Sequence, residues 1–361
     1  MNKLSAILRA HIEKTGPMPV ADYMCLALQH PEYGYYRQGD PLGQGGDFIT
    51  APEISQMFGE MIGLWCADIW RQMGSPEQFV LLEMGPGRGT LMQDALRAIA
   101  KISGFHQALQ LYFLESSETL REMQKEKLAA YNPQYIDTFS AANASLPPFP
   151  TIIIANEFFD ALPIRQFEKS FQGWCERLVT IEKDAFVFTL SKPDDALLLL
   201  IPEAMRDANP GTVFELSPAS INLTRDLAKH IAQNGGAALI VDYGCAAPDG
   251  KPTLQAVADH RYANVLGNPG EADLTALVDF GMLQRAAVTE GTGTYGPVGQ
   301  GEFLKALGID LRADQLKLRA TAQQASAIDS ALRRLTHPAQ MGVLFKALAI
   351  TTSDITECAG F

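Results

Sequence analysis

The sequence lacks the features that mark several large classes of protein. No apolar run approaches the roughly 18 residues that cross a membrane, and the longest, 196–201, has the length of a strand. The five cysteines are odd in number and form no C-x-x-C pair, which argues against a secreted disulfide scaffold and a zinc site. The six histidines form no H-E-x-x-H motif or close pair, so we expect no metal.

Basic residues are also scarce. The 361 residues include 29 Lys and Arg against 41 Asp and Glu, for a formal net charge of −12. Binding to a nucleic-acid backbone needs a basic face, so we expect no nucleic-acid partner, whereas a cationic substrate is compatible with this charge. The N-terminus has no apolar core and carries Glu13, which indicates a helix and not a targeting peptide. Together with the unpaired cysteines, this predicts a cytoplasmic protein without a membrane span.

What is present is an ordinary globular composition with 47% hydrophobic residues. Helical spacing first appears in segments 2–14, 19–29 and 55–73. From residue 79, short apolar runs alternate with amphipathic stretches, which predicts a parallel sheet covered by helices on both faces, the doubly wound α/β class. The predicted strands are 79–84, 109–114, 135–139 and 151–155, and the helices between them are 90–100 and 118–130.

The pattern changes after residue 163. Alternating residues and turn signals over 164–190 predict antiparallel hairpins, and 212–216, 219–233 and 237–241 are expected to resume the α/β alternation. In the last part we expect strands near 253–257, 283–288 and 343–350 and helices near 274–279, 301–307 and 320–335. The predicted organisation is a helical cap with a cofactor lid (1–75), half of the α/β core (76–163), an antiparallel insertion on the substrate side (164–210) and the rest of the core (211–361).

A glycine-rich turn follows the strand at 79–84 and carries the most information. Glycines permit positive φ and a close approach of the backbone to a ligand, and the next helix presents free N–H groups. There is no P-loop string, and a dinucleotide fingerprint would need a glycine or alanine where Thr90 stands. With an acid two positions before the turn, the segment resembles the first motif of class I S-adenosylmethionine-dependent methyltransferases, whose ligand offers one carboxylate and one ammonium. The cofactor residues predicted here are Glu83, Gly85, Pro86, Gly87 and Gly89.

Two further strands end in polar residues. Glu115 and Ser116 follow the strand at 109–114, where an acid would bind a ribose diol; the alternative is that Glu115 only caps a helix. The strand at 151–155 runs into Asn156 and Glu157, followed by two phenylalanines and Asp160, at the edge where a methyl acceptor would meet the sulfonium. In the alternative interpretation, Asn156 and Asp160 are turn formers and the phenylalanines belong to the core.

Two other segments are weaker candidates. The glycine-rich tract 46–53 precedes a helix and is interpreted as a lid over the cofactor, with Asp47 and Thr50 as contacts, or else as a packed connector. Asp242 ends another apolar strand, and either faces the same cleft or forms a structural turn.

Longer strings resemble the MidA family, which includes the mitochondrial complex I assembly-factor methyltransferase and bacterial relatives. The resemblance implies a seven-stranded class I methyltransferase (Rossmann-like) fold, S-adenosylmethionine as cofactor, and a protein arginine of a respiratory complex I subunit as acceptor. A guanidinium stays protonated and needs carboxylates to orient it, so Glu157 and Asp160 become the catalytic candidates beside Asn156, with Glu176 or Glu215 as second partners. The strings are GGDFITAPEISQMFGE (45–60), LLEMGPGRGTLM (81–92), NEFFDALPIRQF (156–167), ALIVDYG (238–244) and GPVGQGEFLKALGI (296–309).

Two other functions remain open at this point. One is a nicotinamide-dependent oxidoreductase on a related fold, which Pro86 and Thr90 disfavour. The other is a non-catalytic assembly factor for a respiratory complex that retains a cofactor pocket, against which the intact acidic residues argue. A homodimer is a further expectation.

Overall fold

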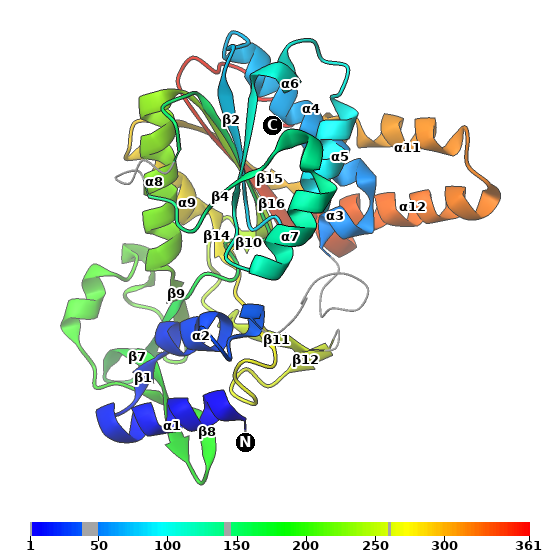
Figure 1. Ribbon diagram of the computed structural model, residues 1–361. Coiled ribbons are helices and arrows are strands. Elements are labelled where there is room, and N and C mark those ends of the chain that lie inside the picture. The colour runs from blue at the N-terminus through cyan, green and yellow to red at the C-terminus, as the bar shows by residue number, and fades with distance from the viewer. Residues whose placement is uncertain (1, 38–49, 141–145, 259–260) are drawn as a thin grey trace.

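The computed structural model describes residues 2–37, 50–140, 146–258 and 261–361 (Figure 1). Its centre is a sheet with the strand order β4-β3-β2-β5-β10-β16-β15. Neighbours from β4 to β10 are parallel, and β16 pairs antiparallel with both β10 and β15. The seven-stranded doubly wound sheet is therefore confirmed. Its strands are β2 (Phe79–Met84), β3 (Leu109–Leu114), β4 (Gln134–Ile136), β5 (Thr151–Asn156), β10 (Gly236–Cys245), β15 (Gly293–Gly299) and β16 (Phe345–Thr351), and β14 (Val278–Asp279) pairs with β10.

The two faces of this sheet form separate cores, because successive strand residues point to opposite sides. Leu81, Ile152 and Leu239 face one core, while Leu82 and Ile153 face the other. On the first face lie α3 (Ala51–Ile54), α4 (Gln56–Gln72), α5 (Thr90–Ala98), α6 (Phe105–Ala108), α10 (Gln300–Ala306) and α11 (Ile309–Lys317). On the second face lie α8 (Pro218–Asn234) and α9 (Phe280–Val288). The near-continuous apolar strands are explained by this double cover.

A second sheet occupies the lower part of Figure 1 and is antiparallel, as expected for the hairpin segment. The N-terminal helices α1 (Lys3–Thr15) and α2 (Val20–Gln29) pack on it through Leu8, Met24 and Val179. Its order is β1-β7-β6-β9 with β8 beside β7, and its strands are β1 (Met18–Pro19), β6 (Arg165–Ser170), β7 (Gly173–Glu182), β8 (Ala185–Leu190) and β9 (Val213–Leu216).

A small three-stranded sheet lies between these two parts. It consists of β11 (Gln255–Ala258), β12 (Arg261–Ala263) and β13 (Asp273–Thr275), and Leu274 belongs to the core beneath α2. Just past β13, the Ala276 N–H donates to the Asp160 carbonyl at 3.0 Å, which joins this sheet to the loop after β5.

Several predicted elements are wrong. Residues 283–288, predicted as a strand, belong to helix α9, and 274–279, predicted as a helix, contain parts of β13 and β14. The error arises because a short apolar run fits the period of a helix and that of a strand equally well. Asp279 caps α9 by accepting a hydrogen bond from the Met282 N–H. The strand at 213–216 pairs with β6 instead of resuming the parallel sheet.

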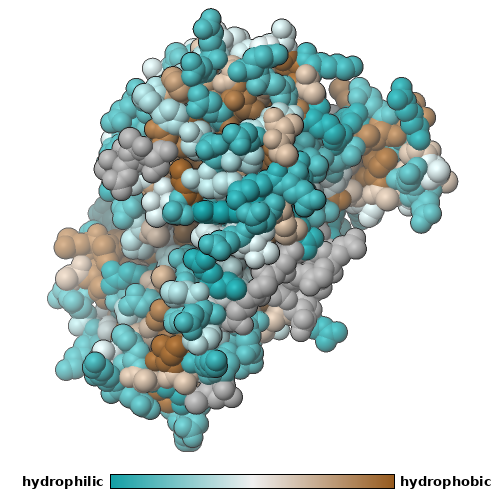
Figure 2. Space-filling view, in the orientation of Figure 1, coloured by the Kyte–Doolittle hydropathy of each residue, from teal (hydrophilic) through white to brown (hydrophobic). Residues whose placement is uncertain are grey.

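α7 (Glu118–Lys127) follows β3, and α12 (Ala322–Thr336) forms with α11 the hairpin at the right of Figure 1. The face in Figure 2 is mainly hydrophilic, with small separate hydrophobic patches. Among the described residues, no helix combines the length and the apolar character that a membrane crossing requires.

Candidate active site

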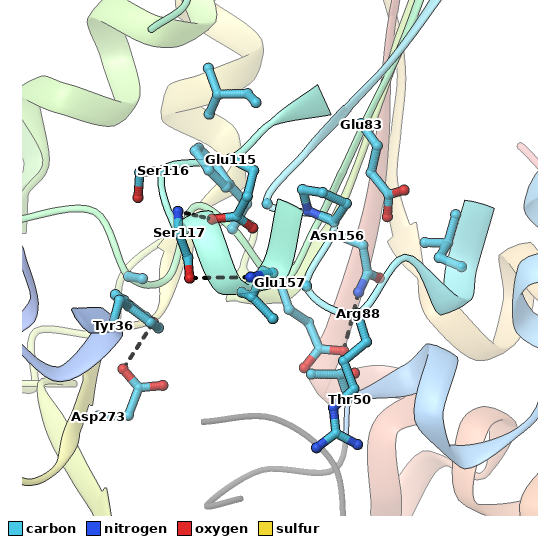
Figure 3. Close-up of a pocket in the computed structure, with 18 of the residues that line it drawn as sticks. Tyr36, Thr50, Glu83, Arg88, Glu115, Ser116, Ser117, Asn156, Glu157 and Asp273 are labelled. Carbon is cyan, nitrogen blue, oxygen red and sulfur yellow. Dashed lines mark hydrogen bonds between the residues drawn. The ribbon is translucent and has the colours of Figure 1, made fainter. Parts of the chain in front are cut away.

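A cavity of about 400 Å³ opens at the carboxyl ends of β2, β3 and β5 (Figure 3). This is the edge where open α/β sheets bind ligands. Ten of the predicted site residues line the cavity: Thr50, Glu83, Gly85, Pro86, Gly87, Glu115, Ser116, Asn156, Glu157 and Asp160.

The glycine-rich turn forms one wall. Gly85 and Gly87 have φ of +64° and +53°, and a Cβ on Gly85 would lie 2.8 Å from Cδ2 of Phe158. A side chain at either position would therefore strain the backbone or fill the wall. Gly89 has φ of +72° and precedes α5, but it faces Gln124 of α7 and does not line the cavity.

Glu83 presents a buried carboxylate to the cavity. Only 3% of the residue is exposed, and its Oε2 has no hydrogen-bond partner among the described residues. Burial, and secondly the charge of Glu115, raises the pKa of this carboxyl to about 8. An orphaned buried carboxylate oxygen is costly unless a ligand satisfies it, and a ligand ammonium would do so with a charge-assisted hydrogen bond.

Glu115 directly follows β3, the next strand along the sheet, and its carboxylate accepts two hydrogen bonds within the protein. Its Oε1 accepts from the Ser117 N–H at 2.8 Å and its Oε2 from Gln124 Nε2 at 3.4 Å. Oε1 of Glu115 therefore helps to cap α7, as in the alternative interpretation, and the residue also lines the cavity. Burial raises its pKa. The neighbouring Ser116 carbonyl accepts from Arg37 Nη1 at 3.0 Å.

Glu157 follows β5 in a left-handed conformation, with φ of +49°. Its Oε1 accepts from the Ala51 N–H at 2.8 Å and from Asn156 Nδ2 at 3.3 Å. Burial is the main cause that raises the pKa of Glu157 to about 7. Asn156 is 9% exposed, and its Oδ1 has no partner among the described residues. A non-glycine residue held at positive φ is a costly conformation that is often found at functional sites.

Asp242 is the residue that holds this loop in place. It is fully buried, and its Oδ2 accepts from the N–H groups of Phe158, Phe159 and Asp160 at 3.0, 2.8 and 3.3 Å. Burial raises the pKa of Asp242 to about 6, and burial with the charges of Asp242 and Asp273 raises that of Asp160 well above its ordinary value. The structural-turn interpretation of Asp242 is closer to this arrangement, since its role is to support its neighbours.

Two candidates lie elsewhere. Glu176 forms a bidentate ion pair with Arg165, with both N–O distances 2.7 Å. Glu215 accepts from Gln166 Nε2 at 2.6 Å and from Thr253. Neither lines the cavity, so the structure does not bring either of them to Glu157 as a second partner. Asp47 lies outside the described residues.

The cavity also contains residues that the sequence did not indicate. They include Tyr36, whose hydroxyl donates to Asp273 Oδ1 at 3.0 Å, and Arg88 of the glycine turn. Tyr36 and Asp273 are 237 residues apart, so no local motif could have paired them. Among the described residues, no group of three or more His, Cys, Asp or Glu side chains has the arrangement of a metal site.

Comparisons with protein families and with solved structures show what this chain is similar to. Residues 61–298 match the model of a family described as "Putative S-adenosyl-L-methionine-dependent methyltransferase". A solved relative from Burkholderia thailandensis, bound to S-adenosyl-homocysteine, is 30% identical, has a TM-score of 0.85 and covers 99% of this chain and 93% of its own. The chain belongs to this methyltransferase family. Its cofactor is S-adenosylmethionine, and the MidA resemblance is confirmed. The oxidoreductase and non-catalytic alternatives are not favoured.

Curated relatives of this methyltransferase carry more specific names. The Drosophila melanogaster protein "Protein arginine methyltransferase NDUFAF7 homolog, mitochondrial" is 36% identical and covers 96% of this chain and 84% of the relative. The Homo sapiens "Protein arginine methyltransferase NDUFAF7, mitochondrial" is 35% identical, with 94% and 81% coverage. These names contradict the expected cytoplasmic location. Unpaired cysteines indicate a reducing compartment, but they do not distinguish one such compartment from another.

Proposed function

We propose that this methyltransferase modifies an arginine side chain of a protein. The observation that carries the proposal is the pair of carboxyl groups from Glu157 and Asp160 on one loop of the cavity wall. Neither carboxyl group is in an ion pair within the described residues, so a cationic guest would neutralise buried negative charge. The names of the relatives point to the same acceptor, and the family resemblance points to a respiratory complex I subunit.

The residues proposed to hold the cofactor follow from its charged groups. Glu83 binds the ammonium through Oε2, which has no hydrogen-bond partner in the described part of the chain, and the turn at Gly85–Gly87 with the start of α5 receives the carboxylate. Glu115 accepts hydrogen bonds from the ribose hydroxyls, with Ser116 beside it. Thr50, and Asp47 by prediction, contact the cofactor from the lid segment. When bound, S-adenosylmethionine supplies a methyl group on a positively charged sulfur.

Glu157 has two tasks in this proposal. It orients the guanidinium, and it accepts the proton that the attacking nitrogen loses as the N–C bond forms and the S–C bond breaks, with the electron pair left on sulfur. A carboxyl group with a pKa of about 7 suits such proton transfer near neutral pH. Asp160 shares the charge of the guanidinium, and Asn156 Oδ1 accepts one of its N–H groups.

We propose a role for each of the four larger segments of the chain from its position in the fold. We assign 1–75 to the cap and lid, 76–163 and 211–361 to the core, and 164–210 to the side that faces the protein substrate. A homodimer stays a prediction.

The test is the Glu157→Gln variant, with Glu126→Gln on the exposed face of α7 as the control that removes a negative charge elsewhere. We expect Glu157→Gln to abolish transfer of tritiated methyl groups to arginine peptides and to leave the dissociation constant of S-adenosylmethionine within about twofold, because Glu83 is intact. Retained turnover would exclude Glu157 as the catalytic group. Loss of methyl-arginine from the host proteome on deletion of the gene, measured by mass spectrometry, tests the acceptor itself.

A further inference from the structure

Tyr36 and Asp273 form a polar pair at the side of the cavity that lies away from Glu83 in Figure 3. The Tyr36 hydroxyl donates to Asp273 Oδ1 at 3.0 Å. Asp273 is 7% exposed and begins β13. Both residues come from outside the parallel sheet: Tyr36 lies in the 3-10 turn Tyr35–Arg37 (η1) after α2, and Asp273 lies in the small sheet.

This pair is attached to the loop that carries the catalytic candidates. The Ala276 N–H donates to the Asp160 carbonyl at 3.0 Å, so the backbone after β13 is held against that loop. Asp160 and Asp273 are close enough for each charge to be felt by the other. A second observation points to a ligand here: the Oδ1 of Asn156, a residue more than nine-tenths buried, lines the same cavity and accepts no hydrogen bond from the described residues.

We propose that Asp273, beside Asp160, is a third carboxyl group that binds the acceptor guanidinium together with Glu157 and Asp160, and that Tyr36 is the positioning residue that orients it. This inference rests on the proposed function, and it fills the place for which Glu176 and Glu215 were the sequence-based candidates. The hydrogen bond from the Tyr36 hydroxyl to Oδ1 restricts the orientation of the Asp273 carboxylate.

The number of acceptors matches a guanidinium better than an ammonium. A guanidinium offers five N–H donors in a plane, whereas a lysine ammonium offers three on one atom. The cavity is lined by the carboxyl groups of Asp160, Asp273 and Glu157 and by Asn156, which come from the end of β5, the loop that follows it and β13. Several acceptors from two segments of the chain suit a planar cation with five N–H donors, so the site is expected to select arginine over lysine.

The turn η1, which contains Tyr36, also contacts the part of the cavity that is proposed to hold the cofactor. Arg37, the neighbour of Tyr36, donates from Nη1 to the Ser116 carbonyl at 3.0 Å, beside the predicted ribose site. One short segment of the N-terminal cap therefore touches both halves of the cavity. For this reason the test must separate acceptor binding from cofactor binding.

The experiment measures steady-state kinetics on an arginine peptide for Asp273→Asn, Tyr36→Phe and the double variant, with S-adenosylmethionine binding followed by calorimetry. We expect kcat/KM for the peptide to fall about 30-fold or more in Asp273→Asn and about fivefold in Tyr36→Phe. The cofactor dissociation constant should stay within about twofold in each variant. Because Tyr36 acts through Asp273, its substitution should have little further effect in the Asp273→Asn background. The exposed sites Asp354→Asn and Tyr262→Phe serve as matched controls.

The outcomes distinguish this inference from the function on which it rests. A wild-type protein that methylates no arginine overturns the proposed function. A wild-type protein that does so, together with an Asp273→Asn variant of unchanged kcat/KM, overturns the clamp alone. Equal losses of peptide and cofactor affinity in Asp273→Asn would show that the pair only supports the fold. Additive effects in the double variant would overturn the positioning role of Tyr36.

Discussion

The carboxyl group of Glu83 illustrates how a single side chain couples folding to ligand binding. Its pKa of about 8 in the folded protein means that the free protein holds it largely protonated at neutral pH. A bound ammonium favours the charged form instead, so cofactor binding should release a proton and strengthen as pH rises toward 8. The site is thus built for its ligand at some cost to the free protein.

This coupling gives a prediction for Glu83→Gln. The folded pKa lies above the unfolded value, so the carboxyl contributes stability that is complete below about pH 4.5 and is lost as pH rises through about 8. The free variant should therefore unfold with a weaker pH dependence and exceed the wild type at pH 9 by a few kcal/mol, on the order of the shift converted to energy. Urea denaturation at pH 5, 7 and 9 checks this. Parallel curves for wild type and variant would contradict it, and Glu126→Gln is again the control.

At the scale of elements, an ion-pair network attaches α11 to the helices α4 and α5. Glu60 of α4 is 2% exposed and accepts from Arg312 of α11 through Nε at 2.7 Å and Nη2 at 2.9 Å. Arg97 of α5 adds a third contact at 3.2 Å. Removing one partner of a buried pair leaves the other charge poorly solvated, which usually costs more than replacing both.

We therefore predict that Arg312→Met destabilises the protein by about 2–3 kcal/mol, and that the double variant Glu60→Met, Arg312→Met recovers part of this loss. The measurement is urea unfolding followed by circular dichroism. Neither residue lines the cavity, so the cofactor dissociation constant should not change. If the double variant is no more stable than Arg312→Met, the loss comes from the contacts that Arg312 makes and not from the unpaired charge left on Glu60.

At the scale of the whole molecule, the net charge of −12 acts on the approach of the substrate. A negative protein attracts a basic peptide over several ångströms, and salt screens this attraction. We predict that kcat/KM for an arginine peptide with basic flanks falls about tenfold between 0.05 and 0.5 M salt, whereas a peptide with neutral flanks changes little. If kcat/KM depends on salt equally for both peptides, the salt effect arises in the active site and not from the electrostatic field of the whole protein.

The sequence by itself determined the core of the fold and one half of the site. Unbroken apolar strands can be buried only between two helical layers, and a glycine turn led by Glu83 is a local feature that a single strand and helix create. Glu115, Asn156 and Glu157 were found for the same reason, since each stands directly at the end of its strand. The choice between helix and strand failed at 274–288, where short apolar runs fit both periods.

Only the tertiary structure decided which side chains and N–H groups contact each acidic residue. Glu176, Glu215 and Asp273 are all acidic, but Arg165 and Thr253 contact the first two, while the folding of the N-terminal cap brings Tyr36 to the third. Asp242 became a support because the loop after the neighbouring strand β5 places three N–H groups around its carboxylate. Such contacts join residues tens to hundreds of positions apart. They depend on how separate elements pack, which the local order of residues does not encode.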